Sequence, residues 1–279
     1  MKSDKQIKNV VVVSDIHAGS ALGLCPPEGA PLDDGGVYKP SKAQLTMWSW
    51  WEEFWGEWVP WAVEGEPYCV VFNGDALDGV HHGTTTLISA NLGDQAEIAH
   101  QILEPIVAKC DGKYWHIRGT EAHVGQSAAE EERLAKRLGA VRSPEGHYAR
   151  WELWKQLGDA CLIHFLHHIG TTSSNAYEGT AVHKELVESF VEAARWGHQP
   201  PDFIIRSHRH RHFETKVMTG RGRASAVVTP GWQLKTPFTF KIAGARLSQP
   251  QCGGIVIRRN KDVHYAIEKV WSLSRPAVE

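Results

Sequence analysis

The sequence of 279 residues has few cysteines, little net charge and only a short apolar run near its N-terminus. Its five cysteines are odd in number and widely spread, without a C-x-x-C pair, which argues against a disulfide framework or a thiolate zinc site. The formal net charge of −2 does not indicate nucleic-acid binding, although it leaves that partner open. The apolar run is only four valines long, too short for a signal peptide or a membrane span. We therefore expect a cytoplasmic protein without a membrane partner.

Histidine and tryptophan are abundant instead, with 16 and 12 copies, and the histidines occur in informative strings. Asp15 and His17 stand two residues apart, as do His208 and His210, and this spacing in an extended segment aims both side chains to one side. Asp75 follows a second apolar run in the same way as Asp15 follows the first. Carboxylates and imidazoles at the exits of buried strands are typical of a mixed oxygen and nitrogen metal site. The sequence therefore predicts a metalloenzyme.

With 279 residues, of which 42% are hydrophobic, the chain can form one large α/β domain or two small ones, and we expect a single domain over residues 1–279. A loop and a Trp-rich helix, together residues 19–61, form an insertion between the first and second motifs. The predicted strands and hairpin arms are Asn9–Val13, Tyr68–Phe72, Lys113–Arg118, Tyr148–Lys155, Ala160–Leu166 and Asp202–Ser207. Helices are expected at Asp94–Lys109, after a capping box at Ser127, and at Thr180–Trp196. Three last strands, Ala224–Thr229, Gly254–Arg259 and Val263–Val270, are expected to close a second sheet.

The Trp-rich helix carries Trp48, Trp51, Trp55 and Trp58 at three- and four-residue steps, which places them on one face. Stripes of this kind usually pack in the core, so we favour core packing over a platform for stacking bases. Trp50 lies off this face and is expected to be the exposed member.

The motifs together resemble those of the calcineurin-like metallophosphoesterases. That family has Asp-x-His, Gly-Asp-x-x-Asp, Gly-Asn-His-Asp/Glu, a lone His and Gly-His-x-His, each after a strand. The matches here are Asp15/His17, Gly74-Asp75 with Asp78, a changed motif at Gly119 to His123, a histidine within 164–168, and His208/His210. The resemblance covers about residues 9 to 232. It implies a four-layer α/β/β/α sandwich, two mixed sheets flanked by helices.

The resemblance also implies a site and a reaction. Two divalent transition-metal ions, Mn, Fe, Zn or Ni, would form a dinuclear centre with a metal-bridging hydroxide that hydrolyses phosphomonoesters or phosphodiesters. The implied ligands are Asp15, His17 and His210 for one ion, His167 and His208 for the other, and Asp75 between them. His123 would protonate the leaving alkoxide, since its pKa suits neutral pH. Asp78 is expected behind the ligands rather than among them.

The third motif departs from the family pattern. Thr120, Glu121 and Ala122 precede His123, so the metal-binding Asn is missing. Glu121 is a good ligand by its chemistry and either replaces that Asn or merely faces solvent or orients His123. The two interpretations stay open at this stage.

Only one histidine of the cluster 164–168 is expected to be a ligand. Strand alternation puts His167 on the face of Ile163 and Phe165, and His164 with His168 on the other. The resemblance favours His167, the first of these beyond the strand, and leaves His164 as a core residue. His81, His82 and His212 are expected to face solvent, with the alternative that one of them lines the pocket.

Two alternative functions accompany the hydrolase. A nuclease acting on DNA or RNA is suggested by Trp50 and the long loop Gly19–Pro40. A non-catalytic binding scaffold is suggested by the altered third motif, although the retained ligand pairs argue against it. The sequence does not predict the oligomeric state.

Overall fold

The computed structural model has the mixed α/β class expected from the sequence. It describes residues 7–81, 83–159, 161–170, 174–242, 248–260 and 263–273. The predicted strand start at Ala160 and the histidine at position 82 lie outside the described residues. Within the described ranges, no helix combines the length and the apolar character that crossing a membrane requires.

The first sheet has the strand order β13-β12-β1-β4-β5-β6. Its strands are β1 (Asn9–Val13), β4 (Tyr68–Asn73), β5 (Tyr114–Ile117), β6 (Ala149–Arg150), β12 (Cys252–Asn260) and β13 (Val263–Trp271). Strands β1, β4, β5 and β6 run parallel, while β12 pairs antiparallel with β1. The buried valines of β1 form its centre, as a parallel strand covered on both faces requires.

The second sheet has the order β10-β11-β9-β8-β7. Its strands are β7 (Leu153–Leu157), β8 (Cys161–Phe165), β9 (Phe203–Arg206), β10 (Phe213–Thr219) and β11 (Gly222–Val228). A small hairpin of β2 (Ala30–Pro31) and β3 (Val37–Tyr38) stands within the predicted loop.

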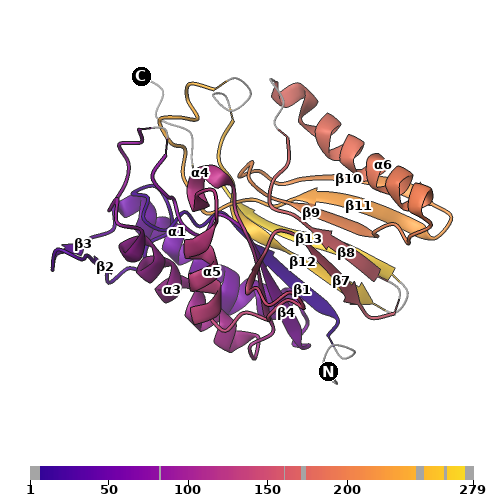
Figure 1. The fold of residues 1–279 in the computed structure, drawn as a ribbon, viewed down its shortest axis with the longest axis horizontal. Coiled ribbons are helices and arrows are strands. Elements are labelled where there is room, and N and C mark those ends of the chain that lie inside the picture. Colours follow the sequence, from indigo (N-terminus) through magenta and orange to yellow (C-terminus); the bar gives the residue numbers. More distant parts are fainter. Residues whose placement is uncertain are drawn as a thin grey trace.

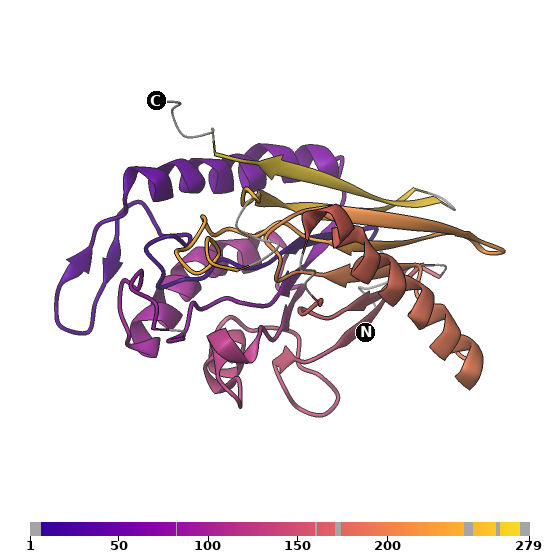
Figure 2. The ribbon, with the colours of Figure 1, turned by 90° about the horizontal axis from the view of Figure 1, so that it is seen from above.

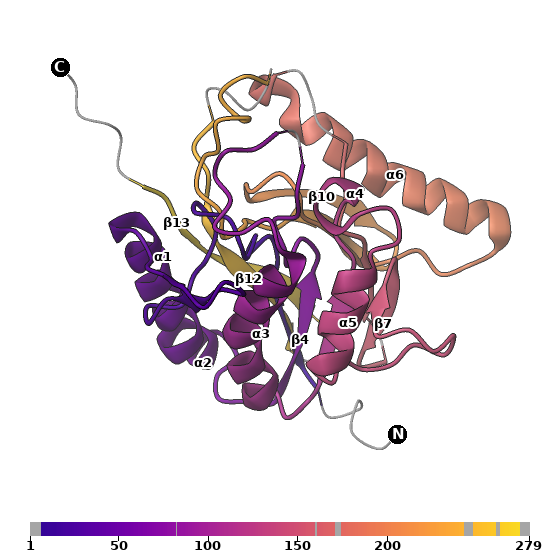
Figure 3. The ribbon, with the colours of Figure 1, turned by 60° about the vertical axis from the view of Figure 1, so that its left-hand side comes forward.

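Helices flank the sheets on opposite sides of the molecule (Figures 1 and 3). They are α1 (Lys42–Glu53), a π-helical turn (Phe54–Trp58), α2 (Val59–Ala62), α3 (Leu92–Lys109), α4 (Glu121–Val124), α5 (Ala129–Arg137), a 3₁₀ turn (Asn175–Tyr177) and α6 (Glu178–Trp196). One apolar cluster joins α1, α3 and α5 to the first sheet, a second lies between the two sheets, and a third joins α6 to the second sheet.

Three of the four tryptophans in the stripe, Trp51, Trp55 and Trp58, are buried as predicted, while Trp48 is half-buried against the same apolar cluster. The expectation for Trp50 is wrong: it is half-buried and stacks on Trp271 of β13, which lies beside α1 (Figure 2). Trp61 is the exposed member, at 68%. The partner of Trp50 comes from the far end of the chain, which local periodicity does not reveal.

Three further expectations are corrected by long-range pairing. The predicted strand Tyr148–Lys155 is divided, because residues 149–150 pair in the first sheet and residues 153–157 in the second. The last two strands join the first sheet through β1, not the second. The helix α5 has no capping box at Ser127; its N-cap is Ala128, at a φ of 49°.

Candidate metal centre

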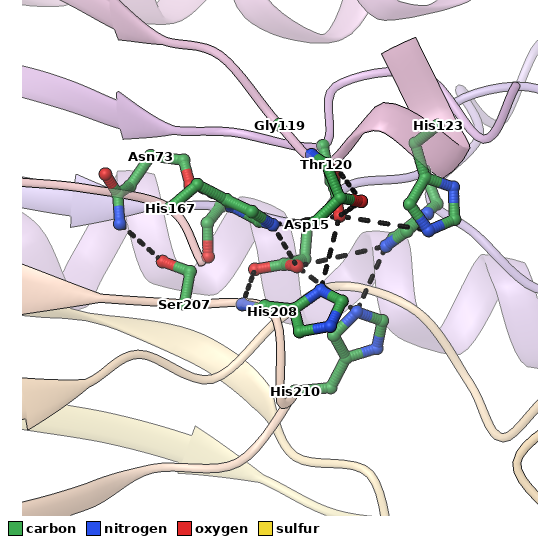
Figure 4. A network of polar contacts seen from close by, with 12 residues as sticks. Asp15, Asn73, Gly119, Thr120, His123, His167, Ser207, His208 and His210 are labelled. Atoms are coloured by element: carbon green, nitrogen blue, oxygen red, sulfur yellow. Dashed lines mark hydrogen bonds and ion pairs between the residues drawn. The ribbon is translucent and has the colours of Figure 1, made fainter. Parts of the chain in front are cut away.

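The predicted site residues come from strand ends of both sheets. Asp15 and His17 follow β1, Asp75 follows β4, and His123 lies in α4 beyond β5. His167 follows β8, and His208 with His210 follow β9. Figure 4 shows the labelled histidines and Asp15 turned toward one another. The carboxyl ends of the parallel strands thus bring together residues almost 200 positions apart.

The loops that carry these residues adopt an unusual backbone. Eight non-glycine residues in the described part of the chain have a positive φ, and five of them belong to the site: Asp15, His17, Asp75, His208 and His210. Such conformations cost about 1–3 kcal/mol each and persist where the surroundings impose them. Their concentration here indicates that the fold holds these side chains in place for a reason other than stability.

Asp15, His17 and His210 form the first group of ligand atoms that could hold one metal ion. Nε2 of His17 and Nε2 of His210 lie 3.0 Å apart, and Oδ1 of Asp15 is 3.2 Å from His210 and 3.9 Å from His17. All three side chains are largely buried. Two imidazole nitrogens and a carboxylate oxygen therefore converge on one point.

Asp75, His167 and His208 form the second group. Oδ2 of Asp75 lies 2.9 Å from Nε2 of His167 and 3.9 Å from Nδ1 of His208. Asp75 also belongs to a group with His17 and His123, with its Oδ2 3.9 Å from Nε2 of His123. Asp75 therefore belongs to the second group and also adjoins His17 of the first.

In three of the histidines, Nδ1 donates a hydrogen bond to an oxygen. Nδ1 of His17 donates to Asp78 Oδ1 at 3.1 Å, and Nδ1 of His167 donates to the backbone oxygen of Asn73 at 2.5 Å. Nδ1 of His123 donates to the backbone oxygen of Asp78 at 2.6 Å. These bonds leave each Nε2 to face the carboxylates, the arrangement by which proteins orient metal-binding histidines.

Burial and mutual charge set the protonation of the centre. Burial alone would raise the pKa of Asp75, but His167 and His123 outweigh it and hold that pKa well below its usual range. Burial would lower the pKa of His167, yet Asp75 and Asp15 raise it to about 10. The carboxylates of Asp15 and Asp75 therefore stay ionised at neutral pH, and they stabilise a positive charge placed near both of them. Burial lowers the pKa of His123 to about 4, against the opposing charge of Asp75, so its imidazole is neutral at pH 7.

Thr120 is the residue after Gly119, at the start of the altered third motif. Its backbone N–H donates to Asp75 Oδ1 at 2.7 Å, and its hydroxyl lies 3.3 Å from each oxygen of that carboxylate. A Cβ on Gly119 would meet Asp75 Oδ1 at 2.0 Å, so only glycine allows this approach. Glu121 is exposed and lies in none of the metal-capable groups of the described residues. The third motif therefore clamps Asp75 through Thr120 and does not bring Glu121 to the cluster.

The histidines outside the two groups have different surroundings. His164 packs inside the second sheet, stacked on Trp154 with ring centroids 4.2 Å apart, and His168 is exposed. His212 is half-buried and lies in none of the groups. His81 does not face open solvent and instead follows the alternative: it lines the cleft, and its ring centroid is 4.4 Å from that of His123.

Sequence reasoning missed two supporting residues. Glu131, buried in α5, accepts the N–H of Ala76 at 3.0 Å and that of Gly119 at 2.7 Å, and so joins the loops of the second and third motifs. Gln233 donates to Asp78 at 3.0 Å. A carboxylate in an otherwise polar helix and a lone glutamine give no sequence signal; only the partners reveal their roles.

The centre opens into a cleft of about 620 Å³. His17, His123, His208 and His210 line it, together with residues 84–86, 233–239, 241 and 242. Arg209 and Arg211 also line it, with Arg209 bonded to the backbone oxygen of Glu178 and Arg211 paired with the Glu178 side chain. A pocket of this size accommodates a small organic ligand.

The residues fit divalent transition metals. Each of the two groups offers one carboxylate and two imidazoles, without thiolate, which suits Mn, Fe, Zn or Ni. Nε2 of His17 and Nε2 of His210 can bind a metal ion only in the tautomer that carries the proton on Nδ1.

No known family profile matches the chain, and no curated protein matches it. Solved structures do align with it. A Vps29 double mutant from Entamoeba histolytica has 9% identity over 94% of this chain and 99% of its own, with a TM-score of 0.38. The protein TM1076 of Thermotoga maritima has 9% identity over 95% and 100%, with a TM-score of 0.36. The sulfate thiohydrolase SoxB of Thermus thermophilus has 11% identity over 95% and 56%, with a TM-score of 0.35.

Proposed function

We propose that this chain is a metal-dependent hydrolase of phosphomonoesters or phosphodiesters with a dinuclear centre, on the four-layer sandwich of the calcineurin-like metallophosphoesterases. The observation that carries the proposal is the pair of adjoining groups, Asp15/His17/His210 and Asp75/His167/His208. A ligand oxygen of Asp75 also lies within 4.8 Å of a ring nitrogen of His17, which belongs to the first group. This position suits a carboxylate shared by two ions.

The side chains have distinct tasks in this proposal. Asp15, His17 and His210 would hold one ion, His167 and His208 the other, and Asp75 both. Bound divalent ions would neutralise the anionic phosphate oxygens and lower the pKa of a coordinated water. Thr120 and Glu131 hold Asp75 and its loop in position.

His123 is the proposed proton donor to the leaving group. It reaches the cleft, and the backbone oxygen of Asp78 fixes its ring with Nε2 directed toward Asp75. Burial favours its neutral form, so it needs an anionic phosphate beside it to take up a proton. The nuclease alternative loses support, since Trp50 stacks on Trp271 instead of standing free.

The test begins with chelated protein that is reloaded with each candidate metal. Elemental analysis should find close to two ions per chain, and the loaded protein should hydrolyse p-nitrophenyl phosphate or its bis-ester. Asp75→Asn should lose both ions together, whereas Asp159→Asn, in the exposed turn between β7 and β8, should lose neither. Metal at trace level after reloading would refute the proposal.

A second variant tests the proton donor. His123→Ala should keep both ions but lower turnover by about 10²–10⁴-fold for esters with poor leaving groups, and less for activated aryl esters. An equal loss for both kinds of ester would assign His123 a positioning role instead.

A further inference from the structure

A further cluster of metal-binding side chains adjoins the candidate centre. Ligand atoms of Asp78, His81 and His123 lie within 4.8 Å of one another. The rings of His81 and His123 meet edge to face with centroids 4.4 Å apart, and Nε2 of His81 is 3.8 Å from Oδ1 of Asp78. All three residues line the cleft, so the cluster is reached from the same side as the centre.

The cluster is built into the fold and is not a chance surface grouping. Asp78 is 2% exposed, and its Oδ1 accepts from His17 at 3.1 Å and from Gln233 at 3.0 Å. Its backbone N–H donates to Ala18 at 3.0 Å. Oδ1 is also the Asp78 oxygen that lies near His81, so a cation bound there would share it with the bonds from His17 and Gln233.

The chemistry of these three ligands favours one class of metal ion. One carboxylate and two imidazoles suit a borderline divalent ion such as Zn²⁺, and three protein ligands leave coordination positions open to the cleft. We propose that Asp78, His81 and His123 form a third divalent-metal site, weaker than the two of the proposed centre. It is weaker because Asp78 already accepts hydrogen bonds from two histidines. Its side chain accepts from His17, and its backbone oxygen accepts from His123.

A consequence for activity rests on the proposed function. His123 cannot hold an ion and deliver a proton through the same nitrogen. Excess Zn²⁺ should therefore inhibit hydrolysis of esters with poor leaving groups by occupying the third site. In this role His81 is a metal ligand that regulates the enzyme and takes no part in the reaction itself.

The experiment measures zinc bound by the full chain at rising free Zn²⁺, with the elemental content read after equilibrium dialysis. The wild type should bind two ions tightly and a third at higher concentration. His81→Asn and His81→Gln should lose the third ion alone and lose the inhibition by excess Zn²⁺. His183→Asn, an exposed histidine on α6, is the matched control and should retain all three. Urea unfolding curves for each variant check that the fold is kept.

The outcomes separate the two proposals. A wild type that saturates at two ions and hydrolyses esters would overturn the third site and leave the proposed function standing. A third ion that persists in both His81 variants would also overturn it, by assigning that ion to other residues. A chain that binds no ion tightly would overturn the proposed function.

Discussion

Glu131 offers a sharp test of how the fold holds the candidate centre. Its carboxylate is fully buried and accepts the backbone N–H groups of Ala76 and Gly119, one on each oxygen. These residues flank Asp75 and Thr120, so one side chain fixes both loops. Glu131→Gln keeps the size of the side chain but replaces one acceptor oxygen with an NH₂ group, which then faces a backbone N–H.

The magnitude follows from that single replacement. One hydrogen bond to a carboxylate is lost and one buried N–H is left unpaired, which together should lower the free energy of unfolding by about 2–4 kcal/mol. The measurement is a urea unfolding curve of the metal-free protein. The metal affinity of the variant should also fall, because the loop of Asp75 loses its support.

The neighbouring Glu130→Gln is the matched control. Glu130 lies one residue earlier in α5 and pairs at the surface with Arg133, so its loss should change stability by no more than about 0.5 kcal/mol. If Glu131→Gln were as stable as Glu130→Gln and bound metal like the wild type, the reasoning that Glu131 joins the two loops would be refuted.

Three further predictions test other parts of the molecule. Thr120→Val should weaken metal binding at Asp75 by about tenfold in a metal titration, because the hydroxyl contact is lost, while Glu121→Ala next to it should have no effect. Burial lowers the pKa of His164 to about 3. Below about pH 6.5 this histidine is therefore protonated in the unfolded chain but stays neutral in the folded protein. Stability should therefore fall by about 2 kcal/mol between pH 7.5 and pH 5 through this group, and His164→Phe should remove that part of the fall in urea unfolding of metal-free protein. Ser41→Ala should destabilise the protein by about 1 kcal/mol in the same assay, since Ser41 caps α1.

Each of these has a contrary result. Equal metal affinity in Thr120→Val and wild type would mean that the backbone N–H alone orients Asp75. A pH dependence unchanged in His164→Phe would assign the acid sensitivity to other histidines. A neutral Ser41→Ala would show that the tertiary contacts of α1 make its cap unnecessary.

The sequence by itself predicted the elements whose signal is local. The strand Asn9–Val13 has the predicted bounds, because four adjacent β-branched residues suit only a strand covered on both faces. Strand alternation separated His167, which faces Asp75, from His164, which packs against Trp154. Both results depend on the order of residues within a few positions.

Tertiary structure alone decided the features that depend on distant partners. The sheet that receives β12 is fixed by its pairing with β1, more than 200 residues earlier, and Trp50 finds its partner at Trp271. The roles of Glu131 and His81 follow from backbone groups and rings that other loops bring to them. A side chain's chemistry is written in the sequence, but its hydrogen-bond partners and its burial are set only when strands distant in the chain meet at one edge of the sheets.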